Sequence, residues 1–222
     1  MNHIKAFTLR AIRWSTRNWK YATERRARAR WRQLEPRLPR TADGRLLLHI
    51  GCGDINAKDF VNIDARPLPH VHIVANSLFN LYMIPDGVAD MIYMSHVLEH
   101  VSHLELHSTL LELRRILRSN GVLRLSVPDF DKLVEIYFAE GRDLRSVEQA
   151  LMGAQDYRQN FHYSVFNEMN LRFVLSRAGL LNVQLWDAND CAHHNFIDWA
   201  NRKIELGSKK YDVSLNIEAR AP

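Results

Sequence analysis

Short apolar runs alternate with helical patterns from residue 46 to the end of the chain. The first five runs are four to six residues long, mostly rich in Val, Ile and Leu, and bounded by Gly, Pro, Asp or Asn. Such runs are typical of strands that are buried on both faces of a parallel sheet. The predicted strands are 46–50, 60–64, 71–75, 89–94 and 122–127, with two more at about 183–186 and 212–219.

Helical patterns separate several of these strands. The clearest helix begins at Ser102, which forms a capping box with Glu105 and is followed by a leucine stripe. The pair Asn120-Gly121 predicts where this helix ends. Further helices are predicted over 131–138 and 168–177, and no helix follows the last strand. This alternation predicts an α/β fold with a doubly wound sheet, into which the last strand inserts without a crossover helix.

The first 35 residues have a helical period but a different composition. Apolar positions recur at spacings of three, four and seven, and Pro36 and Pro39 predict the end of the helix. Residues 1–40 contain 12 Lys and Arg against two Glu, whereas residues 41–222 contain 18 Lys and Arg against 23 Asp and Glu. The chain therefore divides into a basic amphipathic arm, 1–40, and an acidic domain, 41–222.

Three interpretations of the arm are compatible with this pattern. Its apolar stripe can pack on the domain while the arginines stay in water. It can instead lie on an anionic membrane surface, with Trp14, Trp19 and Trp31 at the headgroup boundary. Binding to nucleic acid is disfavoured, because the rest of the chain is acidic.

The arm does not have the composition of a signal peptide, because its arginines continue to Arg40 and interrupt any apolar core. No window of the sequence approaches the roughly 20 apolar residues that span a bilayer. Cys52 and Cys191 provide no disulfide framework, which favours a reducing compartment. We therefore expect a cytoplasmic protein, either free or peripheral to the inner face of the membrane.

A glycine pair follows the first predicted strand, where it lets the backbone approach a ligand closely. The dinucleotide fingerprint requires a third glycine three residues later and an acid about 20 residues further on. Here Asn56 occupies the third position, and Asp64 comes 11 residues after Gly53. The sequence therefore favours a nucleoside without a pyrophosphate, with Asp64 on its ribose hydroxyls.

Four motifs in this order resemble the class I methyltransferases that use S-adenosylmethionine. They are LHIGCGD (48–54), VNID (61–64), IPDGVADMIYMSHVLEHV (84–101) and LRRILRSNGVLRLSVPDF (113–130). The stretches 155–180 and 213–222, with the pair Trp186-Asp187, are similar to a narrower group of small, largely uncharacterised bacterial methyltransferases. The resemblance covers 46–222 and implies a Rossmann-like sheet of seven strands with the last strand antiparallel.

The same resemblance implies S-adenosylmethionine as the cofactor and assigns residues to it. The loop backbone contacts the methionine part and the ribose, Asp64 binds the ribose hydroxyls, and a later segment borders the adenine. Two positions depart from the family pattern: His49 stands where many members have an acid, and Asn76 where Asp is common. An amide can still accept a hydrogen bond from the adenine amine. The implied cofactor residues are Gly51, Cys52, Gly53, Asp64, Asn76, Ser77 and Leu78.

Candidate catalytic residues lie at the carboxyl ends of strands or in the polar loop before the 168–177 helix, because ligands bind at that edge of open α/β sheets. His96 follows the fourth strand and is the first candidate for a general base, although a histidine there can also bond backbone. His162 lies in the loop and is the second candidate. Asp129 follows the fifth strand and can instead cap the next helix.

The histidines at 96, 100, 103 and 107 have a spacing that would align them on one helix, as a metal site requires. Ser102 breaks this row, because it starts a new helix between the first two and the last two. We therefore expect no metal there, nor at the pair His193-His194. Cys52 is not expected to be a nucleophile, because no base accompanies it.

These observations predict an S-adenosylmethionine-dependent methyltransferase with an unidentified small-molecule or glycan acceptor. The basic, tryptophan-bearing arm suggests work near a membrane on a glycan or lipid-linked acceptor. Two alternatives remain open. One is a catalytically silent module with the same fold that binds a partner through the arm, and the other is an NAD-dependent oxidoreductase.

Overall fold

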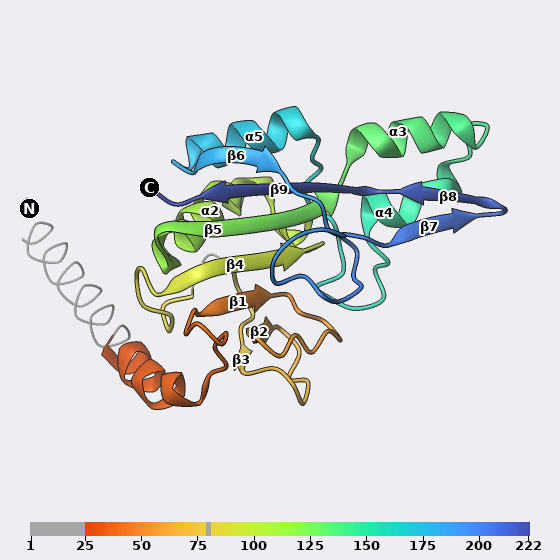
Figure 1. The fold of residues 1–222 in the computed structure, drawn as a ribbon. Helices are drawn as coiled ribbons and strands as arrows, with labels where there is room; N and C mark the ends of the chain where they lie inside the picture. The colour runs from red at the N-terminus through yellow and green to blue at the C-terminus, as the bar shows by residue number, and fades with distance from the viewer. Residues whose placement is uncertain (1–24, 79–80) are drawn as a thin grey trace, which may run out of the picture. The chain divides into compact units, whose positions relative to one another are not determined.

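The computed structural model describes residues 25–78 and 81–222. The helix expected over the first 24 residues therefore lies outside the described residues (Figure 1). The described residues form two compact units, one of 25–38 with 81–85 and the other of 39–78 with 86–222. None of the described helices has both the length and the apolar character needed to cross a membrane.

The smaller unit contains the described part of the basic arm. Residues 25–34 are helical, and the 3-10 helix η1 (Glu35–Arg37) follows, with Pro36 inside it. The backbone is extended at Leu38, so the helix ends where the prolines predict. Trp31 is only 2% exposed, and its indole N–H donates a hydrogen bond to Glu35 Oε2 at 3.1 Å. Trp31 is therefore not a free membrane anchor in this structure.

The larger unit is built on a seven-stranded sheet with the order β3-β2-β1-β4-β5-β9-β6 (Figure 1). β1 to β5 run parallel, and β9 pairs antiparallel with both β5 and β6. The predicted seven-stranded sheet with an antiparallel last strand is confirmed. The strands are β1 (Leu47–Ile50), β2 (Phe60–Asp64), β3 (Ile73–Val74), β4 (Ala89–Ser95), β5 (Leu117–Pro128), β6 (Leu181–Leu185) and β9 (Ser214–Arg220).

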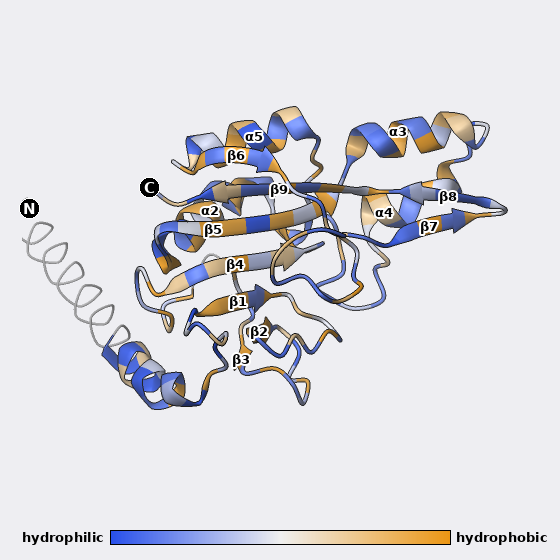
Figure 2. Cartoon of the chain, in the orientation of Figure 1, coloured by the Kyte–Doolittle hydropathy of each residue, from blue (hydrophilic) through white to orange (hydrophobic). Residues whose placement is uncertain are grey.

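Buried apolar side chains explain why the central strands were visible in the sequence. All four residues of β1 are buried, as are six of the seven residues of β4. Figure 2 shows both strands as mainly hydrophobic, whereas the helical residues from 25 onward are mostly hydrophilic. The carboxyl ends of these parallel strands meet at one edge of the sheet, which is the ligand-binding edge of such folds.

The predicted helices are present, but one of them ends earlier than expected. Ser102 caps α2 by accepting a hydrogen bond from the backbone N–H of Leu104 at 3.3 Å. The prediction that α2 continues to Asn120-Gly121 was wrong, because Leu117 is already extended and starts β5. Asn120, with a φ of 61°, makes a turn within that region instead. The helices are α2 (His103–Ile116), α3 (Phe130–Ala139), α4 (Glu148–Met152) and α5 (Glu168–Arg177), with 3-10 helices η2 (Leu98–His100) and η3 (Leu144–Ser146).

One part of the larger unit has no counterpart in the sequence prediction. β7 (Lys203–Leu206) and β8 (Lys209–Asp212) form a separate antiparallel hairpin. Together with α3 and α4 it encloses a small apolar cluster that includes Leu133, Val147 and Val213. Figure 1 shows this group at the end of the sheet to which the arrow of β5 points. The group therefore adds a wall beside the ligand-binding edge.

Candidate active site

The glycine loop is fastened to the end of β2. Gly51, with a φ of +70°, donates its N–H to the carbonyl of Ile63 at 2.7 Å. Gly53, with a φ of +54°, donates to Asp64 Oδ2 at 2.8 Å. A Cβ at Gly51 would come within 2.2 Å of a methyl group of Val97. Positive φ and this close approach together explain why the position holds glycine.

Asp64 is fixed by its neighbours at the tip of β2. Its Oδ1 accepts a hydrogen bond from the backbone N–H of Arg66 at 2.8 Å, while Oδ2 accepts from Gly53. The side chain is largely buried, with 10% of its surface exposed. Each carboxylate oxygen has a second lone pair, so the group can still accept from two hydroxyls of a ligand.

Asp64 lines a cavity of about 750 Å³, here named the Asp64 cavity. The hydroxyl of Ser77 is buried there and has no hydrogen-bond partner within the described residues. The volume lies in the range of small-molecule sites, roughly 300 to 1,000 Å³. An orphaned polar group and a positioned carboxylate both fit a nucleoside. Six of the predicted cofactor residues line this cavity: Gly51, Gly53, Asp64, Asn76, Ser77 and Leu78.

Cys52 is the one predicted cofactor residue that is not part of this lining. It is 2% exposed, and burial raises the pKa of its thiol to about 12. A thiol at such a pKa is protonated at neutral pH, and the thiolate is the nucleophilic form. This agrees with the prediction that Cys52 is not a nucleophile.

A second cavity of about 630 Å³, here named the His162 cavity, lies beside the first. The α3–α4 segment and the β7–β8 hairpin contribute to its wall through residues such as Gln149 and Leu206. The two cavities share the following lining residues, so they meet at the glycine loop: Gly51, Gly53, Arg66, His96, His100 and Tyr157.

His96 lies at this junction, at the end of β4. Its φ of 52° is uncommon for a residue other than glycine, and such backbone strain is concentrated at functional sites. Nε2 lies 2.8 Å from the hydroxyl of Ser214, which itself donates to the carbonyl of Trp199 at 2.6 Å. Since that hydroxyl hydrogen is used, His96 Nε2 must donate, which leaves Nδ1 as an acceptor. Burial lowers the pKa of His96 to about 3, so the ring is neutral.

His162 and Asp129 have different surroundings. His162 lines the cavity that bears its name, and its pKa is lowered to about 4, first by burial and then by the nearby His100. Asp129 caps α3, because its Oδ1 accepts from the backbone N–H of Asp131 at 3.2 Å. Asp129 is not part of the lining of either cavity. The structure thus brings His96 and His162 to one cavity and gives Asp129 a capping role.

His49 occupies the position where many members of the resembling family have an acid. Its side chain is 1% exposed and lines the His162 cavity rather than the Asp64 cavity. The ring stacks on Phe196 with a centroid distance of 5.6 Å and contacts Tyr93 at 5.0 Å. Burial lowers its pKa to about 4. His49 therefore belongs to an aromatic cluster and leaves the cofactor side without an acid at this position.

Several groups of the second cavity were missed in the sequence. Asp198 accepts a hydrogen bond from the hydroxyl of Tyr93 at 2.6 Å, and Trp199 stacks on His96 with a centroid distance of 5.5 Å. Glu99 is 1% exposed, and burial raises its pKa to about 8. The aromatic and acidic stretch NFIDWANR, 195–202, was the available signal for the first two.

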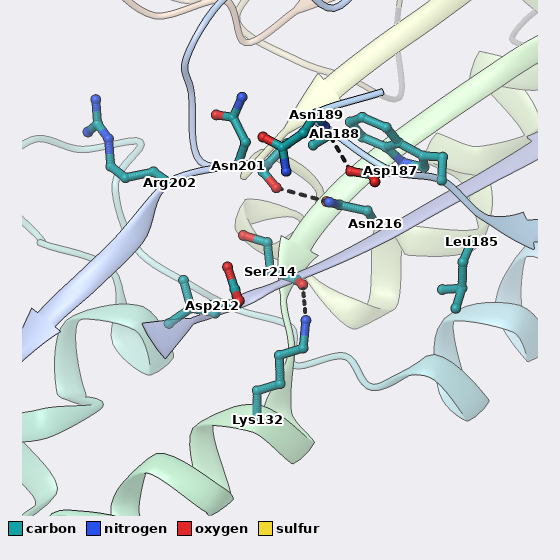
Figure 3. A pocket seen from close by; sticks show the side chains of 13 residues that line it. Lys132, Leu185, Asp187, Ala188, Asn189, Asn201, Arg202, Asp212, Ser214 and Asn216 are labelled. Carbon is teal, nitrogen blue, oxygen red and sulfur yellow. Dashed lines mark hydrogen bonds between the residues drawn. The ribbon is translucent and has the colours of Figure 1, made fainter. Parts of the chain in front are cut away.

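A third hollow of about 450 Å³ lies between β6, β9 and the start of β7 (Figure 3). There Lys132 donates to the backbone carbonyl of Ser214 at 2.6 Å, and Asn216 donates to that of Ala200 at 2.9 Å. Its lining contains neither the glycine loop nor a histidine. The cofactor residues therefore belong to the Asp64 cavity and not to this hollow.

Comparison with known proteins agrees with this geometry. A family model described as a methyltransferase domain matches residues 21–185. The chain belongs to this methyltransferase family. It is an S-adenosylmethionine-dependent methyltransferase, which sets aside the NAD-dependent oxidoreductase and the silent module. No curated protein matches the methyltransferase in sequence.

Solved structures share the fold of this methyltransferase at low sequence identity. An S-adenosylmethionine-dependent methyltransferase from Archaeoglobus fulgidus is 16% identical, with a TM-score of 0.50 over 89% of this chain and 94% of its own. Another from Thermotoga maritima is 15% identical, with a TM-score of 0.52 over 80% of this chain and 82% of its own. Both support the Rossmann-like methyltransferase fold.

Proposed function

We propose that the methyltransferase acts on a hydroxyl group of a polar, glycan-like acceptor bound in the His162 cavity. The observation that supports this is the lining of that cavity, which combines many hydrogen-bonding groups with aromatic rings. Hydroxyl-rich ligands use such groups for orientation, and their apolar ring faces pack on aromatic side chains. The polar groups include Arg66, Arg145, Gln149, Asn160 and Asp198, and the aromatic groups include Tyr157 and Trp199.

The proposed cofactor contacts follow from the Asp64 cavity. The backbone of the Gly51–Gly53 loop borders the methionine part and the ribose, and Asp64 accepts from the ribose hydroxyls. Asn76, Ser77 and Leu78 surround the adenine. When bound, S-adenosylmethionine supplies a methyl group that is already activated by its sulfonium. The rest of the site then has to hold the acceptor oxygen in line with that methyl group, which contributes on the order of 7 to 11 kcal/mol.

His96 is the proposed general base. It borders both cavities, and its Nδ1 keeps a free lone pair because Nε2 donates to Ser214. The acceptor hydroxyl oxygen forms the new bond to the methyl carbon, the carbon–sulfur bond breaks, and the hydroxyl proton moves to His96. His162 on the same cavity is the second candidate. Asp129, as a helix cap, is the least suitable of the three.

Transfer of a radiolabelled methyl group tests this proposal. We expect transfer from S-adenosylmethionine to mono- and oligosaccharides but not to amine or carboxylate panels, with a product that is stable to mild alkali, as an ether is. His96→Gln should lower kcat by about 10²- to 10⁴-fold while S-adenosylhomocysteine still binds. His103→Gln, an exposed histidine on α2, is the matched control and should be unchanged.

Two results would contradict the proposed acceptor chemistry. An alkali-labile product would identify a methyl ester and hence a carboxylate acceptor, and label in the amine panel would identify N-methylation. If calorimetry shows bound S-adenosylhomocysteine but no acceptor in any panel takes up label, hydroxyl transfer is not the activity.

The arm gives a second, separate proposal, that the acceptor is lipid-linked and the enzyme works at an anionic membrane surface. Its exposed arginines can each contribute about 1 kcal/mol to binding such a surface. We expect sedimentation with phosphatidylglycerol vesicles but not with phosphatidylcholine vesicles. Neutralising the arginines should abolish it while Trp31 keeps its packing. The positions to change to Gln are Arg25, Arg26, Arg28, Arg30 and Arg32, which lie on the described part of the arm.

Deletion of residues 1–35 should remove vesicle binding as well. Equal sedimentation with neutral and anionic vesicles, or full binding after either change, would rule out an electrostatic membrane contact through the arm.

A further inference from the structure

Glu99 is a buried carboxyl group without a hydrogen bond. It lies in η2, directly after β4, and its side chain is 1% exposed. Both carboxyl oxygens are inaccessible, and neither accepts a hydrogen bond from any residue in the described part of the chain. A buried ionised group in this situation is strongly unfavourable unless a proton or a cation compensates it. The site therefore needs a partner for Glu99 that the chain itself does not provide.

Two imidazoles face this carboxyl group. His162 Nε2 lies 3.9 Å from Glu99 Oε1, and the rings of His100 and His162 meet edge to face at a centroid distance of 4.7 Å. One potential ligand atom from each of the three residues lies within 4.8 Å of the other two. These separations are long for hydrogen bonds. Ligands at about 2.0 to 2.2 Å from a common ion lie roughly 3 to 3.5 Å apart, so small side-chain movements would suffice.

His100 keeps one ring nitrogen available. Its Nδ1 lies 3.1 Å from the carbonyl of Phe161, and its Nε2 lies 3.2 Å from the carbonyl of His96. A neutral imidazole has a single N–H, so only one of these two contacts is a hydrogen bond. The other nitrogen presents its lone pair to an oxygen, which is repulsive unless the nitrogen binds something else.

We propose that Glu99, His100 and His162 bind a divalent transition-metal ion at the wall of the His162 cavity. Two imidazole nitrogens and one carboxylate oxygen suit Zn²⁺, Fe²⁺, Co²⁺ or Mn²⁺ better than Mg²⁺ or Ca²⁺, which prefer oxygen ligands alone. His100 and His162 both line the cavity, so the remaining coordination positions are open to an acceptor oxygen or to water. The site does not depend on which acceptor the enzyme uses.

Metal titration of the untagged, full-length, chelator-treated protein tests this site. Calorimetry with Zn²⁺ and visible absorption with Co²⁺ should both show one ion per chain. Glu99→Gln and His162→Asn should each weaken binding by about 100-fold or more, because each removes one of three protein ligands. S-adenosylhomocysteine binding by each variant shows that it remains folded, and His100→Asn is a third variant if either of the first two fails to fold.

The double variant His103→Ala, His107→Ala is the matched control. These histidines are exposed and one helical turn apart on α2, where they form the strongest surface competitor for the ion. The control should retain the Co²⁺ spectrum and the stoichiometry of the wild type. The proposal is overturned if the wild type binds neither ion, or if the control loses binding while Glu99→Gln retains it. Absence of binding would mean that Glu99 is compensated by a proton alone.

Discussion

Replacing Asp64 by alanine is expected to weaken the binding of S-adenosylhomocysteine by about 100- to 1,000-fold. Hydrogen bonds to a charged group contribute about 1.5 to 3 kcal/mol each, and two ribose hydroxyls would lose their acceptor. The change also removes the acceptor of the Gly53 and Arg66 backbone N–H groups, which loosens the loop that borders the ligand. Titration calorimetry of wild type and variant at the same salt concentration measures the effect.

Asp59→Ala is the matched control for this prediction. Asp59 also carries a carboxylate next to β2, but it is exposed and is not part of the lining of the Asp64 cavity. Its loss should leave the affinity unchanged. Asp64→Asn separates the two roles of Asp64, because the amide oxygen can still accept from one loop N–H while the charge is gone. If Asp64→Ala binds within about threefold of wild type, the ribose assignment does not hold.

The parts of the fold that were predictable from the sequence have local causes. β2 and α5 have the bounds that periodicity indicated, because their apolar spacing and flanking residues alone determine them. The end of α2 was mispredicted, since Asn-Gly favours a helix end and a turn equally. Pairing of Leu117 with Ala89 decides between the two, and that contact is not local. The β7–β8 hairpin was missed because its four-residue strands are too charged to alternate clearly.

The candidate site divides in the same way. The glycine loop and Asp64 lie close together in the sequence, so their spacing was informative. Glu99 and His162 are far apart in the sequence, and only the fold brings them together. The interruption of the histidine row by Ser102 is confirmed. The partner of His100 comes from the loop before α5 instead, which spacing along one helix cannot reveal. His49 illustrates a further limit, because every residue of β1 is buried and the sequence does not show which cavity each one faces.

Gly51→Ala is expected to lower the free energy of unfolding by about 2 to 4 kcal/mol and to abolish detectable binding of S-adenosylhomocysteine. A φ of +70° costs a residue with a Cβ about 1 to 2 kcal/mol, and forcing a methyl group into packed surroundings adds about 1 to 3 kcal/mol. The new Cβ would lie 2.2 Å from Val97 Cγ2. Moving Val97 or the loop would displace residues that line the Asp64 cavity. Urea unfolding and calorimetry measure the two effects.

Gly44→Ala isolates the backbone contribution, because Gly44 has a φ of +83° but a Cβ there would meet no atom within 4 Å beyond its chain neighbours. It should cost only the conformational part, about 1 to 2 kcal/mol, and leave ligand binding intact. Val97→Ala in the Gly51→Ala background removes the clashing methyl groups and should recover part of the stability, which a double-mutant cycle quantifies. Equal costs for Gly51→Ala and Gly44→Ala, with no coupling to Val97, would mean that the loop can move away from Val97. The close packing of Gly51 would then have no role in forming the cofactor site.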